Sequence, residues 1–312
     1  MSATPVERLN AALEGRWRIE REPGMKLIRL SPLLLWAALG CSEADQGATT
    51  AEVWEPFAGA LADTQRRNLT SEVNGRTYQI SVSLPENYAT STVTYPVLYA
   101  VDANGQFGTV VETARILHQR ELVPELIIVG IGYPVGRFTN ALAGPRQLDL
   151  SSEGAPGFLE FIRRELIPLV ELEFRTDPAD RAFYGHSLGG FFALYALLEG
   201  EGTFESVIAG SPAIGWGDRA IFQMESAYAE SHNSLSAQLF ISCGVLEDEA
   251  PRYGQSLSNI KNFVALLEAR NYGGLEIKTA YFEGETHLSV IPATISRGLR
   301  AIYEGFPISE NK

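Results

Sequence analysis

Short apolar runs alternate with stretches of helical periodicity along most of the chain, from residue 95 to residue 303. Apolar runs of strand length indicate buried strands, whereas apolar residues spaced three or four positions apart indicate helices. The expected strands span residues 95–102, 125–133, 180–184, 204–209, 237–244 and 275–282, and the expected helices span residues 110–122, 158–171, 191–198, 218–231, 257–270 and 291–303. This alternation predicts an α/β fold with a mostly parallel central sheet, helices on both faces, and ligand sites beyond the carboxyl ends of the strands.

An antiparallel hairpin is expected before this alternation begins. Within residues 71–85 the turn pair Asn74-Gly75 precedes alternating apolar and polar positions, a pattern typical of a hairpin. Residues 41–70 are mostly small and polar, which favours a tether. The folded domain is therefore expected to span residues 71–312.

The N-terminal region has the layout of an export signal. A positively charged start, Met25–Arg29, leads into the uncharged apolar stretch Leu30–Gly40, which Cys41 follows. This stretch is short compared with the roughly 20 residues of a membrane-spanning helix. We expect a lipoprotein-type signal peptide at residues 25–40, with Cys41 lipidated and the protein exported and anchored to a bacterial membrane, facing the periplasm or the cell exterior. Residues 1–24 are then an upstream extension; the alternative is an N-terminal helix with an incidental cysteine.

Composition and charge exclude several classes of partner. The chain is 45% hydrophobic and 20% charged, as in an ordinary globular protein, and its formal net charge of −13 opposes binding to nucleic acid. Two cysteines exclude a disulfide framework, and Cys243, in an apolar run, is expected to be an inert core thiol. No histidine and cysteine spacing predicts a metal site, and no glycine-rich loop predicts a phosphate-bearing cofactor.

The segment Gly185–Gly190, with sequence Gly-His-Ser-Leu-Gly-Gly, joins an expected strand to an expected helix. A G-x-S-x-G pattern in this setting predicts a nucleophile elbow, a tight turn that lifts a serine hydroxyl, here that of Ser187, clear of the sheet edge. A serine hydroxyl needs a base to remove its proton. His287 is the candidate base because it follows the last expected strand, whereas His118 and His232 lie on expected helices and the elbow directs His186 away from the hydroxyl.

A carboxylate that orients the base is expected after the penultimate strand, between the serine and the histidine in chain order. The loop there offers Glu247, Asp248 and Glu249, of which we favour Glu247 and place Asp248 second. A serine–histidine pair without an acid in contact remains an alternative, as does a purely solvated acidic loop.

The negative charge that develops on the substrate oxygen needs fixed hydrogen-bond donors. The backbone N–H of Leu188, directly after the nucleophile, is one expected donor. Asn104 or Ala103, in the loop after the first buried strand, is expected to supply the second, and Asp102 either shapes that loop or only forms the turn.

Taken in order, these motifs resemble the putative esterase family, which includes siderophore esterases, esterase D-like enzymes and mycolyltransferases. The segments that carry the resemblance are Tyr95–Asp102, Arg146–Asp149, Arg175–Asp177, Arg181–Gly190, Ser211-Pro212 with Trp216, and Gly284–His287. The resemblance implies an α/β-hydrolase fold, Ser187 as nucleophile, His287 as base, and an oxyanion hole from Leu188 and the loop at residues 102–104.

Two further residues take candidate roles from this resemblance. Arg146 matches the Arg-x-x-Asp segment of the family and is a candidate for binding an acidic or catecholate group of the substrate, while Asp149 holds the same loop. A structural ion pair is the alternative for both. Trp216 is a candidate wall of an aromatic substrate pocket, and the alternative is a packed surface aromatic.

The sequence therefore predicts a serine esterase that acts on a siderophore-type or other small carboxylic ester, through an acyl-enzyme intermediate and without a cofactor. An acyltransferase differs only in the acceptor of the acyl group and remains an alternative. A non-catalytic binding lipoprotein with the same fold is a third alternative, against which the presence of Ser187 and His287 in the required order counts.

Overall fold

A twisted, mostly parallel sheet runs through the part of the chain that the computed structural model describes, residues 61–136, 140–249 and 255–306. Its order is β1-β2-β4-β3-β5-β6-β7-β8, and only the β1–β2 and β2–β4 pairs are antiparallel. The strands are β1 (Thr64–Thr70), β2 (Thr77–Ser83), β3 (Tyr95–Ala100), β4 (Ile127–Gly132), β5 (Thr176–His186), β6 (Ser206–Gly210), β7 (Ser234–Gly244) and β8 (Gly273–Phe282). The mostly parallel sheet predicted from the sequence is thus present.

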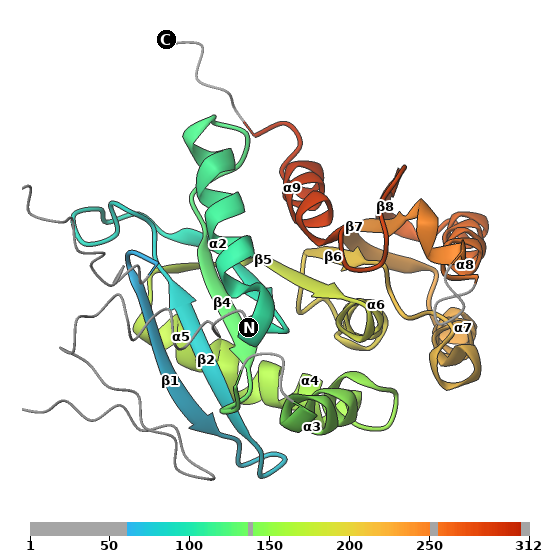
Figure 1. The fold of residues 1–312 in the computed structure, drawn as a ribbon, viewed down its shortest axis with the longest axis horizontal. Coiled ribbons are helices and arrows are strands. Elements are labelled where there is room, and N and C mark those ends of the chain that lie inside the picture. The colour runs from blue at the N-terminus through green and yellow to red at the C-terminus, as the bar shows by residue number, and fades with distance from the viewer. Residues whose placement is uncertain (1–60, 137–139, 250–254, 307–312) are drawn as a thin grey trace, which may run out of the picture. The chain divides into compact units, whose positions relative to one another are not determined.

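Helices cover both faces of this sheet, as Figure 1 shows. The α-helices are α2 (Ala103–Gln119), α3 (Asn140–Leu150), α4 (Ala155–Phe161), α5 (Ile167–Glu173), α6 (Leu188–Glu199), α7 (Trp216–Ser231), α8 (Ser256–Arg270) and α9 (Ile291–Ile302). A π-helical turn, η1 (Ile162–Leu166), joins α4 to α5, and a 3₁₀ turn, η2 (Val245–Glu249), follows β7. None of the described helices is both long and apolar enough to span a membrane.

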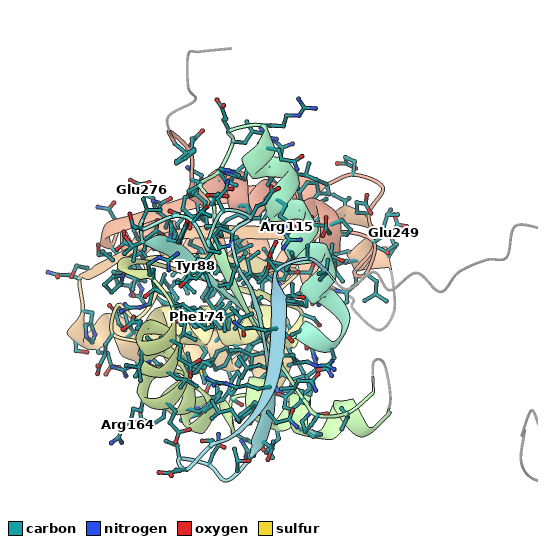
Figure 2. All side chains as sticks on the ribbon, turned by 90° about the vertical axis from the view of Figure 1, so that its left-hand side faces the viewer. Tyr88, Arg115, Arg164, Phe174, Glu249 and Glu276 are labelled. Atoms are coloured by element: carbon teal, nitrogen blue, oxygen red, sulfur yellow. The ribbon has the colours of Figure 1, made fainter. Side chains whose placement is uncertain are left out.

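The central strands are buried on both faces, and this explains their continuous apolar runs. In β3, Leu98 points into the layer under α2 and α9, whereas Tyr99 points into the layer that α4 and α6 cover. In β5, Tyr184 and Phe183 alternate in the same way. Two hydrophobic layers therefore hold the sheet, while charged side chains such as Arg164 and Glu276 lie at the periphery in Figure 2.

Two elements differ from the expectation. β1 lies within the expected tether, because residues 64–70 pair along their whole length with β2 and so form the first strand of the predicted hairpin. The expected loop around Arg146 is instead the helix α3, which contains Pro145. The extension at residues 1–24, the signal peptide at 25–40, Cys41 and the first part of the tether lie outside the described residues.

Strand pairing brings the ends of separate segments together at one edge of the sheet. β3 and β5 are parallel neighbours with Ala100 opposite Tyr184, so the residues that follow each strand emerge side by side. β7 and β8 pair with Gly244 opposite Phe282, so η2 and the loop before α9 also lie together. This carboxyl edge is where the candidate site residues meet.

Candidate active site

Ser187 occupies a strained turn between β5 and α6. Its backbone has φ 61° and ψ −119°, a region that residues other than glycine rarely adopt. A Cβ atom on Gly185 would lie 2.0 Å from the carbonyl oxygen of Gly189, so the turn requires glycine there. The Ser187 N–H donates to the carbonyl of Gly210 on β6 at 2.9 Å, which fixes the strained residue to the sheet. This geometry is that of the predicted nucleophile elbow.

Ser187, His287 and Glu247 form a continuous hydrogen-bonded chain. His287 Nε2 lies 2.9 Å from Ser187 Oγ, and His287 Nδ1 lies 2.8 Å from Glu247 Oε2. An ionised carboxylate can only accept, so Nδ1 carries the proton and Nε2 is left to accept the serine proton. The structure thus brings together the three residues that sequence reasoning favoured; their catalytic roles stay predictions.

Glu247 is fully buried, and its second oxygen is also hydrogen-bonded. Oε1 accepts from the Ser211 hydroxyl at 2.6 Å and from the Gly244 N–H at 3.0 Å. Burial alone would raise the pKa of this carboxyl group, but the hydrogen bonds from His287, Ser211 and Gly244 outweigh burial and lower the pKa. Glu247 is therefore ionised at neutral pH and able to orient the base.

The other two carboxylates of the same turn point elsewhere. Asp248 accepts from the Leu257 N–H at 2.8 Å and from the Ser258 hydroxyl at 2.9 Å, and so caps the first turn of α8. Glu249 is exposed and lies at the periphery in Figure 2. The geometry therefore favours Glu247 over both alternatives.

His186, next to the nucleophile, is buried beside the candidate base. Its ring centroid lies 4.7 Å from that of His287, and neither of its ring nitrogens makes a hydrogen bond of normal geometry among the described residues. Burial and repulsion from His287 lower the pKa of His186 to about 3, against the opposing influence of Glu247. His186 is thus a neutral packing partner of His287 at ordinary pH.

The expected oxyanion donors lie at the first residues of two helices. Leu188 begins α6 and Ala103 begins α2, where backbone N–H groups have no partner within the helix. The Asn104 side chain is engaged elsewhere, because it donates to the carbonyls of Tyr133 and Val135 and accepts from the Tyr133 N–H. Asn104 can therefore serve only through its backbone, and its assignment to the hole stays a prediction.

The side chain of Arg146 forms an ion pair with Asp102. Its Nε and Nη2 atoms donate to the two carboxylate oxygens of Asp102 at 2.5 and 2.8 Å. Asp149, also on α3, is fully buried and accepts from Arg76 and from the hydroxyl of Tyr133. Arg146 and Asp149 thus each form an ion pair with a partner from another part of the chain, and not the pair within one loop that was the alternative from the sequence. Substrate binding by Arg146 stays a prediction.

Trp216 begins α7 and is partly buried against the core. The backbone N–H of Trp216 donates to the carbonyl of Ala213, and the backbone N–H of Ala213 donates to the Ser187 carbonyl at 2.9 Å. The segment therefore runs past the elbow, while the role of Trp216 as a pocket wall stays a prediction. α7 departs from regular geometry at its start, where Gly217 and Asp218 have left-handed backbone.

Sequence reasoning gave no role to Ser211, although Ser211-Pro212 was among the family motifs. The residue directly follows β6, and its hydroxyl reaches Glu247 from the neighbouring strand end. The sequence did carry a signal for this role, because Ser211 follows the expected strand that comes before the strand leading to Glu247. The Asp102–Arg146 pair was missed for another reason, since a carboxylate and a guanidinium 44 residues apart carry no local pattern.

A cavity of about 540 Å³ flanks the start of α2. Its lining includes Ala103, Asn104 and Gly132 together with the polar residues Arg66 and Gln79 of β1 and β2. It offers room beside the expected oxyanion loop. Among the described residues, no group of three or more His, Cys, Asp and Glu side chains is placed to hold a metal ion.

Comparison with known proteins gives a consistent result. A family model described as Putative esterase matches residues 71–274. The ferri-bacillibactin esterase BesA of Bacillus subtilis (strain 168) is 31% identical over 265 residues, which cover 78% of this chain and 90% of that protein. The siderophore triacetylfusarinine C esterase of Aspergillus fumigatus is 33% identical over 273 residues, covering 76% and 92% of the two chains.

Solved structures also match. The BES protein from Bacillus cereus superimposes with a TM-score of 0.70 at 28% identity, covering 80% of this chain and 98% of the other. The siderophore hydrolase EstB from Aspergillus nidulans gives a TM-score of 0.70 at 25% identity, with coverage of 82% and 99%. Both are similar to this chain over nearly their whole length.

Proposed function

This chain belongs to the Putative esterase family, and we propose that it hydrolyses carboxylic esters through a covalent acyl-enzyme on Ser187. The family and the α/β-hydrolase fold predicted from the sequence are both confirmed. The observation that carries the proposed mechanism is the chain of hydrogen bonds from Ser187 Oγ through His287 to Glu247.

In the first half of the reaction, Ser187 Oγ attacks the ester carbonyl carbon while His287 Nε2 takes the hydroxyl proton. Glu247 keeps Nδ1 protonated and stabilises the positive charge that forms on the ring. The carbonyl oxygen becomes an oxyanion, which the N–H of Leu188 and an N–H at the start of α2 receive. The tetrahedral intermediate then collapses, and the leaving alcohol departs with the proton held by His287.

The second half repeats these steps with water as the nucleophile. His287 Nε2 takes a proton from water, the resulting hydroxide attacks the acyl carbon, and collapse of the second intermediate returns the proton to Ser187 and releases the carboxylic acid. An alcohol in place of water would yield a new ester, so the balance between hydrolysis and acyl transfer depends on the acceptor.

Full-length protein assayed with p-nitrophenyl acetate and p-nitrophenyl butyrate, beside Ser187→Ala and His287→Ala, tests the mechanism. We expect both variants to lose activity by about 10⁴-fold or more, and a serine-directed phosphonate to add its mass to the Ser187 peptide of the wild-type protein. Undiminished hydrolysis by Ser187→Ala, or labelling of another residue, would refute the assignment. A new ester formed in the presence of glycerol would identify acyl transfer.

For the substrate, we propose an ester of siderophore type. Support comes from two relatives that cover most of this chain and are named as esterases of siderophores. The cavity beside the start of α2 offers space for a part of the substrate beyond the reacting carbonyl. Hydrolysis of a tris-catecholate trilactone with kcat/KM at least about 100-fold above that of phenyl acetate is the expected result; equal values would argue for a general esterase.

We further propose that the protein is exported and anchored through a lipid on Cys41, which rests on the charged and apolar pattern before that residue. In a bacterial host, radiolabelled palmitate should enter the wild-type protein and not Cys41→Ser. Equal labelling of the two proteins would refute the anchor.

A further inference from the structure

The Arg146 guanidinium contacts both turns that would form the oxyanion hole. It donates to both oxygens of Asp102, at 2.5 Å from Nε and 2.8 Å from Nη2, and Nη2 also lies 3.3 Å from the carbonyl oxygen of His186. Asp102 is the residue before α2, and His186 is the residue before Ser187. One side chain of α3 therefore ties the β3–α2 turn to the β5–α6 turn.

We propose that Arg146 and Asp102 form a positioning pair that sets the distance between the two oxyanion donors, and that Arg146 acts through Asp102 without binding the substrate. This inference rests on the proposed function, because it assumes a serine esterase whose donors lie at the starts of α2 and α6. It replaces the substrate-binding role that the sequence suggested for Arg146.

The backbone at Asp102 needs such support. Its φ of 60° and ψ of 29° are left-handed, an arrangement that a residue with a side chain adopts only at a cost of order 1 kcal/mol. Its carbonyl accepts from the N–H groups of Gly105 and Gln106 at 3.0 Å and so starts α2. The orientation of Asp102 thus decides where the next amides, including that of Ala103, point.

The carboxylate of Asp102 also lies close to the start of α6. A Cβ atom on Gly189 would come within 3.4 Å of Asp102 Oδ2, so the two turns are already in contact. Only about a tenth of the Asp102 side chain and a fifth of the Arg146 side chain are exposed, at 10% and 22%. Removing either partner leaves a mostly buried charge without its counter-ion, and we expect the turn to shift so that water can reach it.

Positioning and substrate binding predict different kinetics. A guanidinium that binds an anionic group of the substrate affects only substrates that carry such a group, and mainly through KM. A guanidinium that sets the oxyanion hole affects every ester, and mainly through kcat, because the hole acts in the transition state. In the positioning model, loss of Asp102 has the same effect as loss of Arg146.

Phenyl acetate and 3-acetoxybenzoate, a neutral and an anionic acetate ester, separate the two models in the full-length protein. We expect Arg146→Gln, Asp102→Asn and the double variant each to lower kcat by about 10- to 100-fold on both esters, with KM changed by less than about 3-fold. The double variant should lose no more than either single variant. Affinity for phenylboronic acid, whose adduct carries the oxyanion, should fall in parallel with kcat/KM.

Arg181 supplies the matched control. It forms a similar half-buried pair, with Nε and Nη2 at 2.9 and 2.6 Å from Glu171 Oε1 and 19% of its side chain exposed. It lies on β5 six residues before Ser187, roughly 20 Å away along the strand. Arg181→Gln should keep kcat within about twofold while lowering the melting temperature as much as Arg146→Gln does.

Loss confined to 3-acetoxybenzoate and expressed in KM would overturn the inference, as would an unchanged kcat in Asp102→Asn. If Arg146→Gln does not fold, Asp102→Asn and Arg146→Lys decide the question, because lysine keeps the charge but cannot bridge both carboxylate oxygens. Failure of the proposed function is recognised separately, since wild-type protein would then hydrolyse neither ester faster than Ser187→Ala.

Discussion

Replacement of Glu247 by glutamine tests the candidate site most sharply, because the surroundings of this residue fix how the new amide must lie. The Oε1 position receives two donors, the Ser211 hydroxyl and the Gly244 N–H. The amide oxygen of glutamine must occupy that position, since an NH₂ group there would face two donors. The amide nitrogen then points at His287 Nδ1, where Oε2 lies 2.8 Å away in the wild-type protein.

This orientation reverses the tautomer of His287. An NH₂ group donates to Nδ1, so the ring proton moves to Nε2, and Nε2 can no longer accept the proton of Ser187. An amide that holds the base in the wrong tautomer lowers kcat by about 10⁴-fold in serine hydrolases. We therefore expect a loss of about 10³- to 10⁴-fold here, which corresponds to about 4–5.5 kcal/mol of transition-state stabilisation at 1.36 kcal/mol per decade.

The assay is steady-state hydrolysis of p-nitrophenyl acetate by full-length Glu247→Gln, with Asp248→Asn as the control. Among the described residues, Asp248 accepts from the Leu257 N–H and the Ser258 hydroxyl of α8, so its replacement should lower the melting temperature by a few degrees and leave kcat within about twofold. If Glu247→Gln keeps more than a tenth of wild-type kcat, the acid has no orienting role, and a serine–histidine pair is sufficient.

Three further results follow from the contacts of the site. Gly185→Ala should give no soluble folded protein, because its Cβ would lie 2.0 Å from a backbone oxygen, whereas Gly157→Ala, with no atom of that kind nearby, should express normally. Ser211→Ala removes a charge-assisted hydrogen bond to Glu247 and should lower the free energy of unfolding by about 1.5–3 kcal/mol in urea titrations, with kcat reduced about 3- to 10-fold. Burial lowers the pKa of His186 from its ordinary value of 6.5 to about 3. Between these two pH values, the unfolded chain carries a proton on His186 that the folded chain does not. Acidification from pH 7 to pH 5 should therefore destabilise the wild-type protein by up to about 2 kcal/mol more than His186→Gln, and an equal pH response of the two would contradict the burial argument.

The parts of the fold that could be predicted from the sequence are those that local chemistry dictates. Continuous apolar runs indicated the central strands because these are buried on both faces, and the glycines around Ser187 indicated the elbow because only glycine fits there. β1 was missed because it is an edge strand with mostly exposed side chains, so its sequence carries no apolar alternation. α3 was missed because Pro145 within it favours a loop by local propensity.

The same distinction separates the site residues. Ser187 and His287 could be named from motif and chain order, and Glu247 from the position of its loop, but the choice over Asp248 depends on which carboxylate turns inward. Nothing local decides that, because both carboxylates lie in one turn and differ only in their tertiary contacts: Glu247 bonds to His287 and Ser211, and Asp248 bonds to α8. The roles of Ser211 and of the Asp102–Arg146 pair depend wholly on tertiary contacts.

The charges of the site balance in a way that favours proton transfer to His287. Asp102 and Arg146 neutralise each other, and Glu247 is the carboxylate that contacts His287 and can stabilise the imidazolium. His186 stays neutral because it is buried, with its ring 4.7 Å from that of His287. Were His186 charged, repulsion at this distance would cost about 3.5 kcal/mol at an effective dielectric constant of about 20, or roughly 400-fold in rate. Burial of His186 next to the nucleophile therefore protects the base from a second positive charge.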